Sequence, residues 1–179
     1  MADSTREFIP VRIAIMTVSD TRTRANDTSG DTLEARIKDA GHIVADRTIV
    51  PDEKDVIAAQ LRKWVADPTI DAVISTGGTG LTGRDVTPEA FRTVFEKEID
   101  GFSAVFHRVS FEKIATSTIQ SRACAGVANG TYIFALPGSP GAVKDGWDGI
   151  LKHQLDHRHK PCNFVEIMPR LQEHQQRKS

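Results

Sequence analysis

The sequence predicts an α/β fold with a largely parallel sheet and helices on both of its faces. Short apolar runs alternate along the chain with amphipathic segments that are long enough to be crossover helices. Polar or glycine-rich segments follow three of these apolar runs. Because ligands bind at the carboxyl ends of the strands in open parallel sheets, we expect these three loops to face one crevice.

The first expected strand covers residues 11–18, where apolar residues are almost continuous, as in a strand buried on both faces. A polar loop over 19–28 separates it from a helix that we expect to begin with Ser29 as its cap and to end at Gly41. Residues 43–50 mix polar and apolar side chains, which predicts a less buried strand near an edge of the sheet.

Asp52 is placed to cap the next predicted helix, which carries apolar residues at helical spacing and ends at Pro68. A short apolar strand over 72–75 then leads into a turn rich in glycine. Thr87 followed by Pro88 is typical of a helix start, with threonine as the cap and proline at the first helical position.

The second half of the chain continues the alternation. A helical segment follows Gly101, and residues 131–136 form another apolar strand. Ser139 and Pro140 are expected to begin a long helix, as cap and first helical residue. Residues 164–168 are predicted to be extended.

Length and composition indicate one soluble globular domain. The 179 residues are 39% hydrophobic and 26% charged, enough for a full core. We expect a polar arm over 1–10, a single domain over 11–170 and a polar tail over 171–179. The net charge of −1 gives no reason to expect nucleic acid or an anionic membrane as partner. Two cysteines, no apolar stretch that could cross a bilayer and no signal-peptide core predict a cytoplasmic protein.

The most informative stretch is Thr76-Gly77-Gly78-Thr79-Gly80, which precedes Asp85 by five residues. A backbone without side chains lets several N–H groups approach a phosphate, and a carboxylate beside it suits a divalent cation. The stretch is no P-loop, because Gly-Lys-Ser/Thr is missing, and no dinucleotide fingerprint, because no helix opens directly after it. A purely structural turn is the alternative, with Asp85 as a solvated loop acid.

Further residues are candidates for anion binding. The loop over 136–141 leaves a strand and enters a helix, whose free N–H groups can bind an anion. Lys144, one turn into that helix, can meet a phosphate or simply face solvent. Arg84 and Arg122 can contact phosphate, although a surface arginine is the simpler interpretation of each.

A cluster of histidines near the C-terminal end suggests a metal site at first inspection. His153 and His157 would share one face of a helix. However, His159 and Cys162 lie beyond the expected end of that helix, and structural zinc sites usually have a tighter signature. We therefore expect the positively charged end of a helix rather than a zinc site.

Taken in order, the motifs resemble those of the MoaB/MogA family of molybdenum cofactor biosynthesis. The similarity extends from about Phe8 to Met168, and residues 7–10 and 158–164 resemble the MoaB branch. The motifs that carry the resemblance are Thr17-Val18-Ser19-Asp20, Asp27-Thr28-Ser29-Gly30, Pro51-Asp52-Glu53, Thr76-Gly77-Gly78-Thr79-Gly80, Asp85-Val86-Thr87-Pro88-Glu89-Ala90, Ser121-Arg122-Ala123 and Leu136-Pro137-Gly138-Ser139-Pro140-Gly141.

The resemblance implies a three-layer α/β/α sandwich with a mostly parallel sheet, the MogA-like molybdopterin-binding fold. It also implies a molybdopterin adenylyltransferase, which converts molybdopterin and ATP, with Mg²⁺, to adenylylated molybdopterin and pyrophosphate. A homo-oligomer is a further implication: trimers are typical of the family and hexamers of the MoaB branch, so a hexamer is expected.

The resemblance also implies roles for individual residues. Asp52 and Asp85 would be the catalytic acids and would hold the metal ion. Some members of the MoaB branch lack these acids and are expected to be inactive, whereas this chain keeps both, which favours an active enzyme. The residues expected to bind substrate or phosphate are Ser19, Asp20, Thr76, Gly77, Gly78, Thr79, Gly80, Thr87, Pro88, Glu89, Ser121, Arg122, Pro137, Gly138, Ser139 and Gly141.

Two other functions remain open at this point. A catalytically silent molybdopterin-binding or scaffold protein would bind the pterin without consuming ATP. An unrelated nucleotide-binding α/β protein would bind ATP without affinity for the pterin. Cys124 departs from the small residues common at its position, and we interpret it as a small buried hydrophobic residue.

Overall fold

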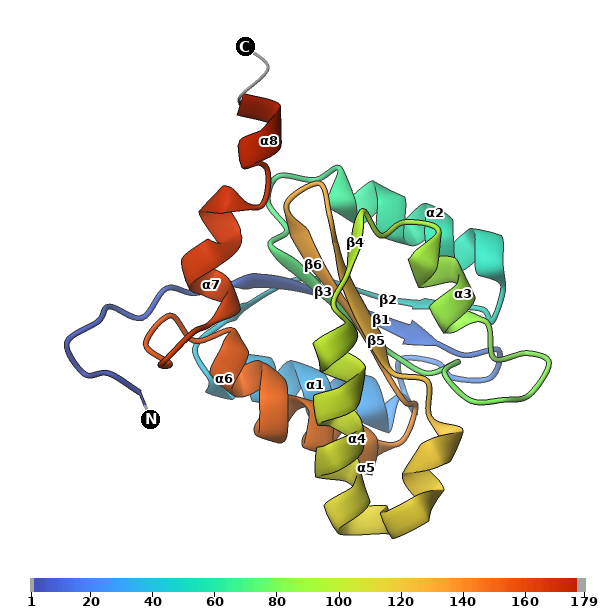
Figure 1. Ribbon diagram of the computed structural model, residues 1–179. Helices are drawn as coiled ribbons and strands as arrows, with labels where there is room; N and C mark the ends of the chain where they lie inside the picture. The colour runs from blue at the N-terminus through green and yellow to red at the C-terminus, as the bar shows by residue number, and fades with distance from the viewer. Residues whose placement is uncertain (1, 177–179) are drawn as a thin grey trace.

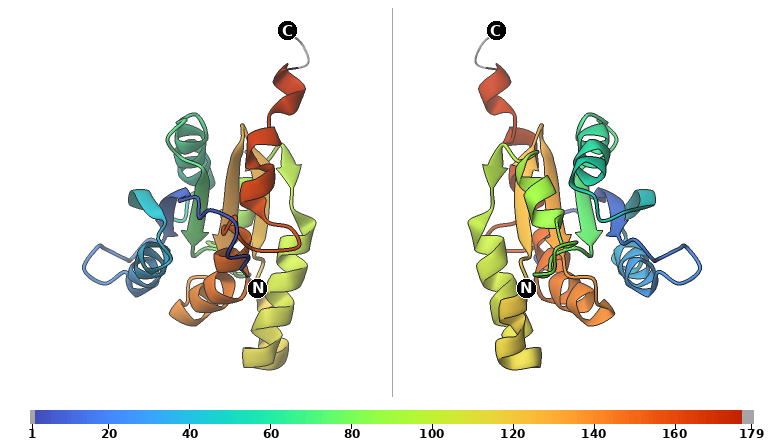
Figure 2. Two further views of the ribbon diagram at one scale, coloured as in Figure 1. Left: turned by 90° about the vertical axis from the view of Figure 1, so that its left-hand side faces the viewer. Right: turned by 90° about the vertical axis from the view of Figure 1, so that its right-hand side faces the viewer.

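A six-stranded mixed sheet forms the centre of the protein, and helices cover both of its faces (Figures 1 and 2). The computed structural model describes residues 2–176. Its strands lie in the spatial order β2-β1-β3-β6-β5-β4; β2, β1, β3 and β6 are parallel, and β5 is antiparallel to both of its neighbours, β6 and β4. The predicted three-layer α/β/α class is confirmed. The strands are β1 (Arg12–Val18), β2 (Ile43–Val50), β3 (Ala72–Thr76), β4 (Lys97–Glu98), β5 (Cys124–Ala128) and β6 (Thr131–Leu136).

The two faces of the sheet carry different helices. The helices α1, α4 and α5 pack on one face, and α2 and α3 pack on the other. No helix within the described part of the chain combines the length and the hydropathy needed to span a bilayer. The helices are α1 (Thr28–Asp39), α2 (Lys54–Val65), α3 (Thr87–Arg92), α4 (Asp100–Ile114), α5 (Pro140–Gly146), α6 (Lys152–Gln154), α7 (Phe164–Ile167) and α8 (Glu173–Gln176).

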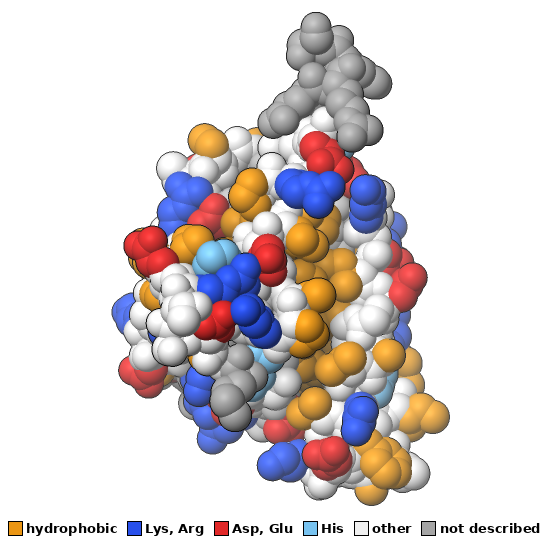
Figure 3. All heavy atoms as spheres, turned by 60° about the vertical axis from the view of Figure 1, so that its left-hand side comes forward, with side chains coloured by type: hydrophobic (Ala, Val, Ile, Leu, Met, Phe, Trp, Pro, Cys, Tyr) orange, Lys and Arg blue, Asp and Glu red, His pale blue; other side chains and the backbone are white. Residues whose placement is uncertain are grey.

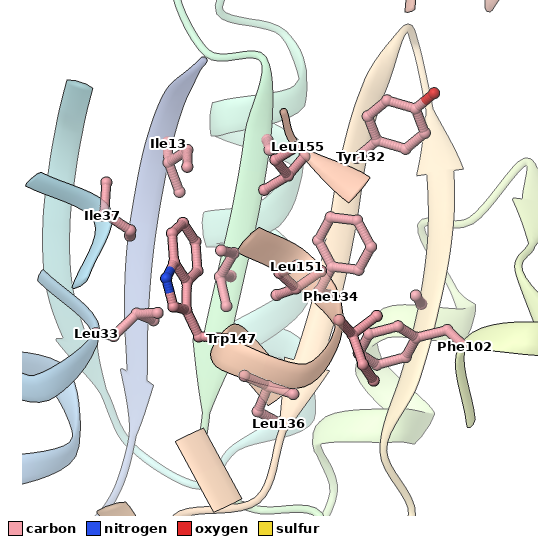
Figure 4. Packing of buried hydrophobic residues seen from close by; sticks show 14 of the residues in the cluster. Ile13, Leu33, Ile37, Phe102, Tyr132, Phe134, Leu136, Trp147, Leu151 and Leu155 are labelled. Atoms are coloured by element: carbon pink, nitrogen blue, oxygen red, sulfur yellow. The ribbon is translucent and has the colours of Figure 1, made fainter. Parts of the chain in front are cut away.

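The central strand β1 shows why its sequence is almost continuously apolar. Ile13 and Ile15 belong to the core on the α1 side, whereas Ala14 and Met16 belong to the core on the α2 side. Figure 4 shows Trp147 in the first of these cores, where it packs between the helices and β1. Fully burying a large side chain of this kind contributes about 1.5–3 kcal/mol to folding.

The edge strand β2 and the helix after Ser139 agree with the sequence-based expectation. β2 ends the sheet on one side, and most of its residues are exposed or half-buried. The Ser139 hydroxyl accepts a hydrogen bond from the Ala142 amide at 3.1 Å, which caps α5. The long helix expected here is interrupted by a π-helical turn, Trp147–Leu151, before α6.

Several elements differ from the prediction, among them β4 and α8, which the sequence analysis does not anticipate. Residues 124–128 form the strand β5, which the sequence did not suggest because its residues are small; pairing with β6 along its whole length produces the strand. The extended segment expected over 164–168 is wrong, since Phe164–Ile167 is helical. The Asn163 side chain accepts the Glu166 amide at 2.8 Å, a cap that favours a helix start.

Three predicted helix caps are also wrong. Asp27, not Ser29, caps α1, because its carboxylate accepts the Gly30 amide at 3.0 Å. The cap position of α2 is Glu53 and has no side-chain hydrogen bond, so Asp52 lies outside the helix. Thr87 lies within the first turn of α3. In each case, a contact with another loop claims the side chain that local sequence assigns to capping.

Candidate functional site

The predicted loops converge at one edge of the sheet. The strands β1, β2, β3 and β6 run in parallel and therefore end together, and antiparallel β5 begins at the same edge (Figure 1). Backbone hydrogen bonds continue past the strand ends: the Ser19 amide donates to the Val50 carbonyl at 2.9 Å, and the Gly77 amide donates to the Leu136 carbonyl at 3.0 Å. The Gly77 amide therefore bonds to the neighbouring strand, whereas the sequence suggests that the amides of this turn bind a phosphate.

The turn after β3 requires glycine for conformation and for space. Gly77 has φ = +105° and Gly78 has φ = +65°, both in the region that favours glycine. A Cβ atom at Gly77 would collide with the Val18 carbonyl. At Gly78 it would collide with the Thr87 hydroxyl and lie 3.0 Å from Asp52 Oδ1. The turn therefore lies directly against β1, α3 and the Asp52 carboxylate.

Buried threonines hold this turn in place. The Thr87 hydroxyl donates to the Gly77 carbonyl at 2.9 Å, and the Thr87 amide donates to the Gly78 carbonyl at 3.0 Å. The Thr76 hydroxyl donates to the Pro137 carbonyl at 2.9 Å. Thr76 and Thr87 are fully buried, and their hydroxyls hold the loops in shape; Thr79 and Pro88 are buried in the same region.

Asp52 is bound to the loop after β1. The Asp20 amide donates to Asp52 Oδ2 at 3.0 Å, and the Asp52 amide donates to Asp20 Oδ1 at 3.1 Å. Burial, and then the negative charge of Asp20, raise the pKa of Asp52 above its ordinary value. Asp52 therefore holds a proton more readily than an isolated aspartate does.

Asp85 has the opposite environment. The Thr82 amide and hydroxyl both donate to Asp85 Oδ2, at 2.8 and 2.7 Å. Burial opposes its ionisation, but these hydrogen bonds and the charge of Arg122 outweigh it, so the pKa of Asp85 lies below its ordinary value. A Cβ atom at Gly80 would lie 2.7 Å from Asp85 Oδ2, so this carboxylate adjoins the glycine turn.

An ion pair connects the loops that follow β1 and β3. The Arg84 guanidinium donates to both carboxylate oxygens of Asp20 at 2.8–2.9 Å. This pairing lowers the pKa of Asp20. Both side chains are exposed, at 60% and 38% of their surface, so an arriving anion can compete for Arg84.

Arg122 contacts the protein chain rather than open solvent. Its Nε donates to the Gly80 carbonyl and its Nη2 to the Asp85 carbonyl, both at 2.8 Å, and Nη1 pairs with Glu89. Next to these groups, Glu89 Oε2 and Ser121 Oγ are buried atoms without a hydrogen-bond partner in the described structure. Arg122 thus braces the loop that carries Asp85.

The loop after β6 lies between α1 and a cavity. The Ser29 hydroxyl donates to the Gly138 carbonyl at 2.7 Å, a contact that sequence reasoning missed because it took Ser29 for a helix cap. Ser139 and Gly141 line a cavity of about 590 Å³ between α4 and α5, together with Lys144 and Lys113. Lys144 therefore lies at the edge of a ligand-sized space.

A buried ion pair supports the start of α1. Arg47 of β2 donates to Asp27 Oδ2 at 2.7 Å, and these side chains are 6% and 1% exposed. The Thr17 hydroxyl also donates to Asp27 Oδ2. Burial opposes the ionisation of Asp27, but the hydrogen bond from Arg47 and those from Gly30 and Thr17 hold its pKa below the ordinary value. In the sequence, the ion pair is indicated only by Arg47 itself, an arginine within the partly apolar segment 43–50.

The histidines near the C-terminal end contact one another or the main chain. The rings of His153 and His159 lie 5.3 Å apart, and His157 Nδ1 lies 3.1 Å from the Glu7 carbonyl oxygen. Across residues 2–176, no three histidine, cysteine, aspartate or glutamate side chains are grouped so as to hold a metal ion. Cys124 is buried, as expected, and burial raises the pKa of its thiol to about 12, which leaves it unreactive.

Most of the chain is similar to a known protein family and to proteins of that family. Residues 14–157 match the family model described as "Probable molybdopterin binding domain". Molybdenum cofactor biosynthesis protein B of Escherichia coli (strain K12) is 50% identical over 164 residues, which cover 92% of this chain and 96% of the relative.

Solved structures of proteins of cofactor biosynthesis are similar to this chain in fold and in sequence. A crystal structure of molybdenum cofactor biosynthesis protein B superimposes with a TM-score of 0.84 at 35% identity, covering 94% of this chain and 99% of that one. The tungsten cofactor synthesizing protein MoaB from Pyrococcus furiosus gives 0.72 at 34% identity, covering 80% and 92%. This chain belongs to the MoaB/MogA family of molybdopterin-binding domain proteins.

Proposed function

We propose that this protein adenylylates molybdopterin with ATP and Mg²⁺ and releases pyrophosphate, as a cytoplasmic step of molybdenum cofactor biosynthesis. One observation carries the proposal: Asp52 and Asp85, which come from different loops, flank the same glycine turn. The family membership supports the pathway, since its relatives bear the name of molybdenum cofactor biosynthesis proteins.

The donor set of the site fits Mg²⁺. This ion prefers carboxylate oxygens and usually takes only one or two of them, with water and substrate phosphates completing its coordination. Asp85 is held ionised, and Asp52 has Oδ1 facing the turn at Gly78. Asp52 and Asp85 would hold the ion, which would neutralise charge on the ATP phosphates.

The proposed reaction needs little general acid–base catalysis from the protein. The terminal phosphate of molybdopterin is already ionised at neutral pH, so it can attack the α-phosphorus of ATP without a general base. The barrier lies in bringing two polyanions together, and positioning and electrostatics dominate such transfers. In the proposal the glycine turn receives a phosphate, and the loop at Gly138 and Ser139 anchors the pterin phosphate or the nucleotide.

The direct test is incubation of the purified protein with molybdopterin, ATP and Mg²⁺, followed by mass analysis of the pterin and measurement of pyrophosphate. Adenylylated molybdopterin with an equal amount of pyrophosphate is the expected result. Pterin binding without ATP consumption would instead assign a silent molybdopterin-binding or scaffold protein. ATP binding without pterin affinity would assign an unrelated nucleotide-binding protein.

We also propose a homo-oligomer, with a hexamer expected over a trimer. Hydrophobic side chains gather on the face that carries α4 and α7 (Figure 3). The exposed fractions of Val105, Phe111 and Ile114 along α4 are 47%, 54% and 51%, and that of Ile119 just beyond is 78%. Apolar patches of this kind often mark protein interfaces. Gel filtration with light scattering tests this, and a monomer at micromolar concentration would contradict it.

A further inference from the structure

Arg122 donates hydrogen bonds to both ends of the loop over residues 80–85. Its backbone amide donates to the Thr79 carbonyl at 3.0 Å, and Nε donates to the Gly80 carbonyl at 2.8 Å. Its Nη2 donates to the Asp85 carbonyl at 2.8 Å, and Nη1 pairs with Glu89 of α3. One guanidinium thus joins the first and the last residue of the segment 80–85.

Between its two ends, this loop is held by the Arg84–Asp20 ion pair and by the hydrogen bonds from Thr82 to Asp85. Residues 81–84 are all exposed, and Leu81 has 69% of its surface accessible. Arg122 binds main-chain carbonyl groups, so its effect on the loop does not depend on the side chains between them. Since the Asp85 carbonyl is fixed from one side and its carboxylate by Thr82, the direction of the carboxylate is set by these two partners.

We propose that Arg122 is a positioning residue, which holds Asp85 in the orientation that adenylyl transfer needs, rather than a ligand of substrate phosphate. The proposal rests on the proposed function in so far as Asp85 serves that reaction. Three of its side-chain nitrogens already bind the protein, and only 29% of the side chain is exposed. A lysine cannot replace these contacts, because its single ammonium lacks the planar fork.

The first test measures the loop itself. Arg84 lies on the exposed part of the segment and is a trypsin cleavage site, so the fragment 1–84 reports how often the loop opens. In R122K and R122M, cleavage after Arg84 should be about tenfold faster or more, because charge-assisted hydrogen bonds to the loop are lost. The matched control is R92M, which removes an exposed arginine of α3 that pairs with Glu98 and should leave this cleavage unchanged.

The second test measures catalysis. In R122K, kcat should fall about 100-fold, the order of effect that a misplacement of about 1 Å can have on a site that depends on positioning. The Mg²⁺ concentration for half-maximal rate should rise, whereas the KM for ATP should change little. Circular dichroism and thermal unfolding verify that each variant is folded.

Several results would overturn the proposal. Cleavage after Arg84 at the wild-type rate in both Arg122 variants would do so. A raised KM for ATP with unchanged kcat and unchanged cleavage would identify Arg122 as a phosphate ligand instead. If neither variant folds, E89Q removes only the ion pair and should still accelerate cleavage; an unchanged rate there also rejects the proposal. A wild-type protein that transfers no adenylyl group would refute the proposed function. The protease measurement would still test whether Arg122 holds the loop over residues 80–85 in place.

Discussion

Asp20 and Asp52 exchange reciprocal hydrogen bonds, each backbone amide donating to the other carboxylate at 3.0 and 3.1 Å. Two negative charges are thereby held together at the edge of the glycine turn. The arrangement is tolerable because Arg84 pairs with Asp20 from the solvent side. The protonation of Asp52 consequently depends on a residue in another loop.

Replacement of Asp20 by asparagine should shift the pH dependence of the reaction. Burial and the charge of Asp20 raise the pKa of Asp52, and a metal-binding carboxylate must be ionised. Removing the Asp20 charge lowers the pKa of Asp52, so the acid limb of the kcat/KM profile should move to lower pH. The pH–rate profiles of wild type and D20N test this.

The control for this experiment is D39N. Asp39 is an exposed aspartate at the end of α1, and its replacement removes the same charge far from the glycine turn. The D39N profile should match that of wild type. An acid limb of D20N that stays in place, or moves to higher pH, would contradict the proposed coupling of Asp20 to Asp52.

Asp85→Asn should retain the fold and pterin binding but stop pyrophosphate release. The amide side chain keeps an acceptor for Thr82, so the loop can remain intact. Loss of a metal-binding carboxylate removes several kcal/mol of transition-state stabilisation, which is about 1000-fold or more in rate. Pyrophosphate measurement and pterin titration follow the two properties separately, and wild-type turnover in D85N would remove the role proposed for this residue.

Gly78→Ala should reduce both stability and activity. The new Cβ atom would collide with the Thr87 hydroxyl and press on Asp52, at a backbone φ of +65°. The expected loss of stability is about 1–3 kcal/mol, the range for a residue in a strained backbone region. Thermal unfolding measures the first effect and the adenylylation assay the second.

The matched substitution is G101A, in the first turn of α4, where a Cβ atom would meet no atom within 4 Å. Alanine there should leave the protein as stable as wild type or slightly more so, because glycine is a poor helix former. If G78A and G101A behaved alike, the steric role of Gly78 would be refuted.

Arg47→Met should destabilise the protein in a pH-dependent manner. The substitution leaves Asp27 buried without its charged partner, which typically costs about 3–5 kcal/mol. Arg47 holds the pKa of Asp27 below the ordinary 3.8, and Glu34, whose pKa falls to about 2 through Lys38 and then Arg47, adds in the same direction. Lowered carboxylate pKa values give stability that is present above pH 4 and lost as the pH falls.

The difference in unfolding free energy between wild type and R47M should therefore be largest near pH 7 and should shrink towards pH 3. Urea unfolding at several pH values measures it. A difference that stays constant over this range would mean that packing, rather than the ion pair, accounts for the effect of Arg47.

The sequence by itself determined the alternation of strands and helices and the three loops at the carboxyl ends of the strands. Apolar runs such as 11–18 and 72–75 are interpretable because burial on both faces demands them. The glycine turn is interpretable because few other residues accept its backbone angles. These features are local, because they depend on residues that are close together in the sequence.

The tertiary structure alone decided how the loops are joined. Asp52 looked like a helix cap, yet its partner Asp20 lies 32 positions earlier in the chain. Arg122 binds Asp85, 37 positions away, and Arg47 binds Asp27, 20 positions away. Strand β5 exists because β6 supplies its hydrogen bonds. Such pairings depend on which elements the folded chain brings together, and a local pattern of residue types carries no record of a distant partner.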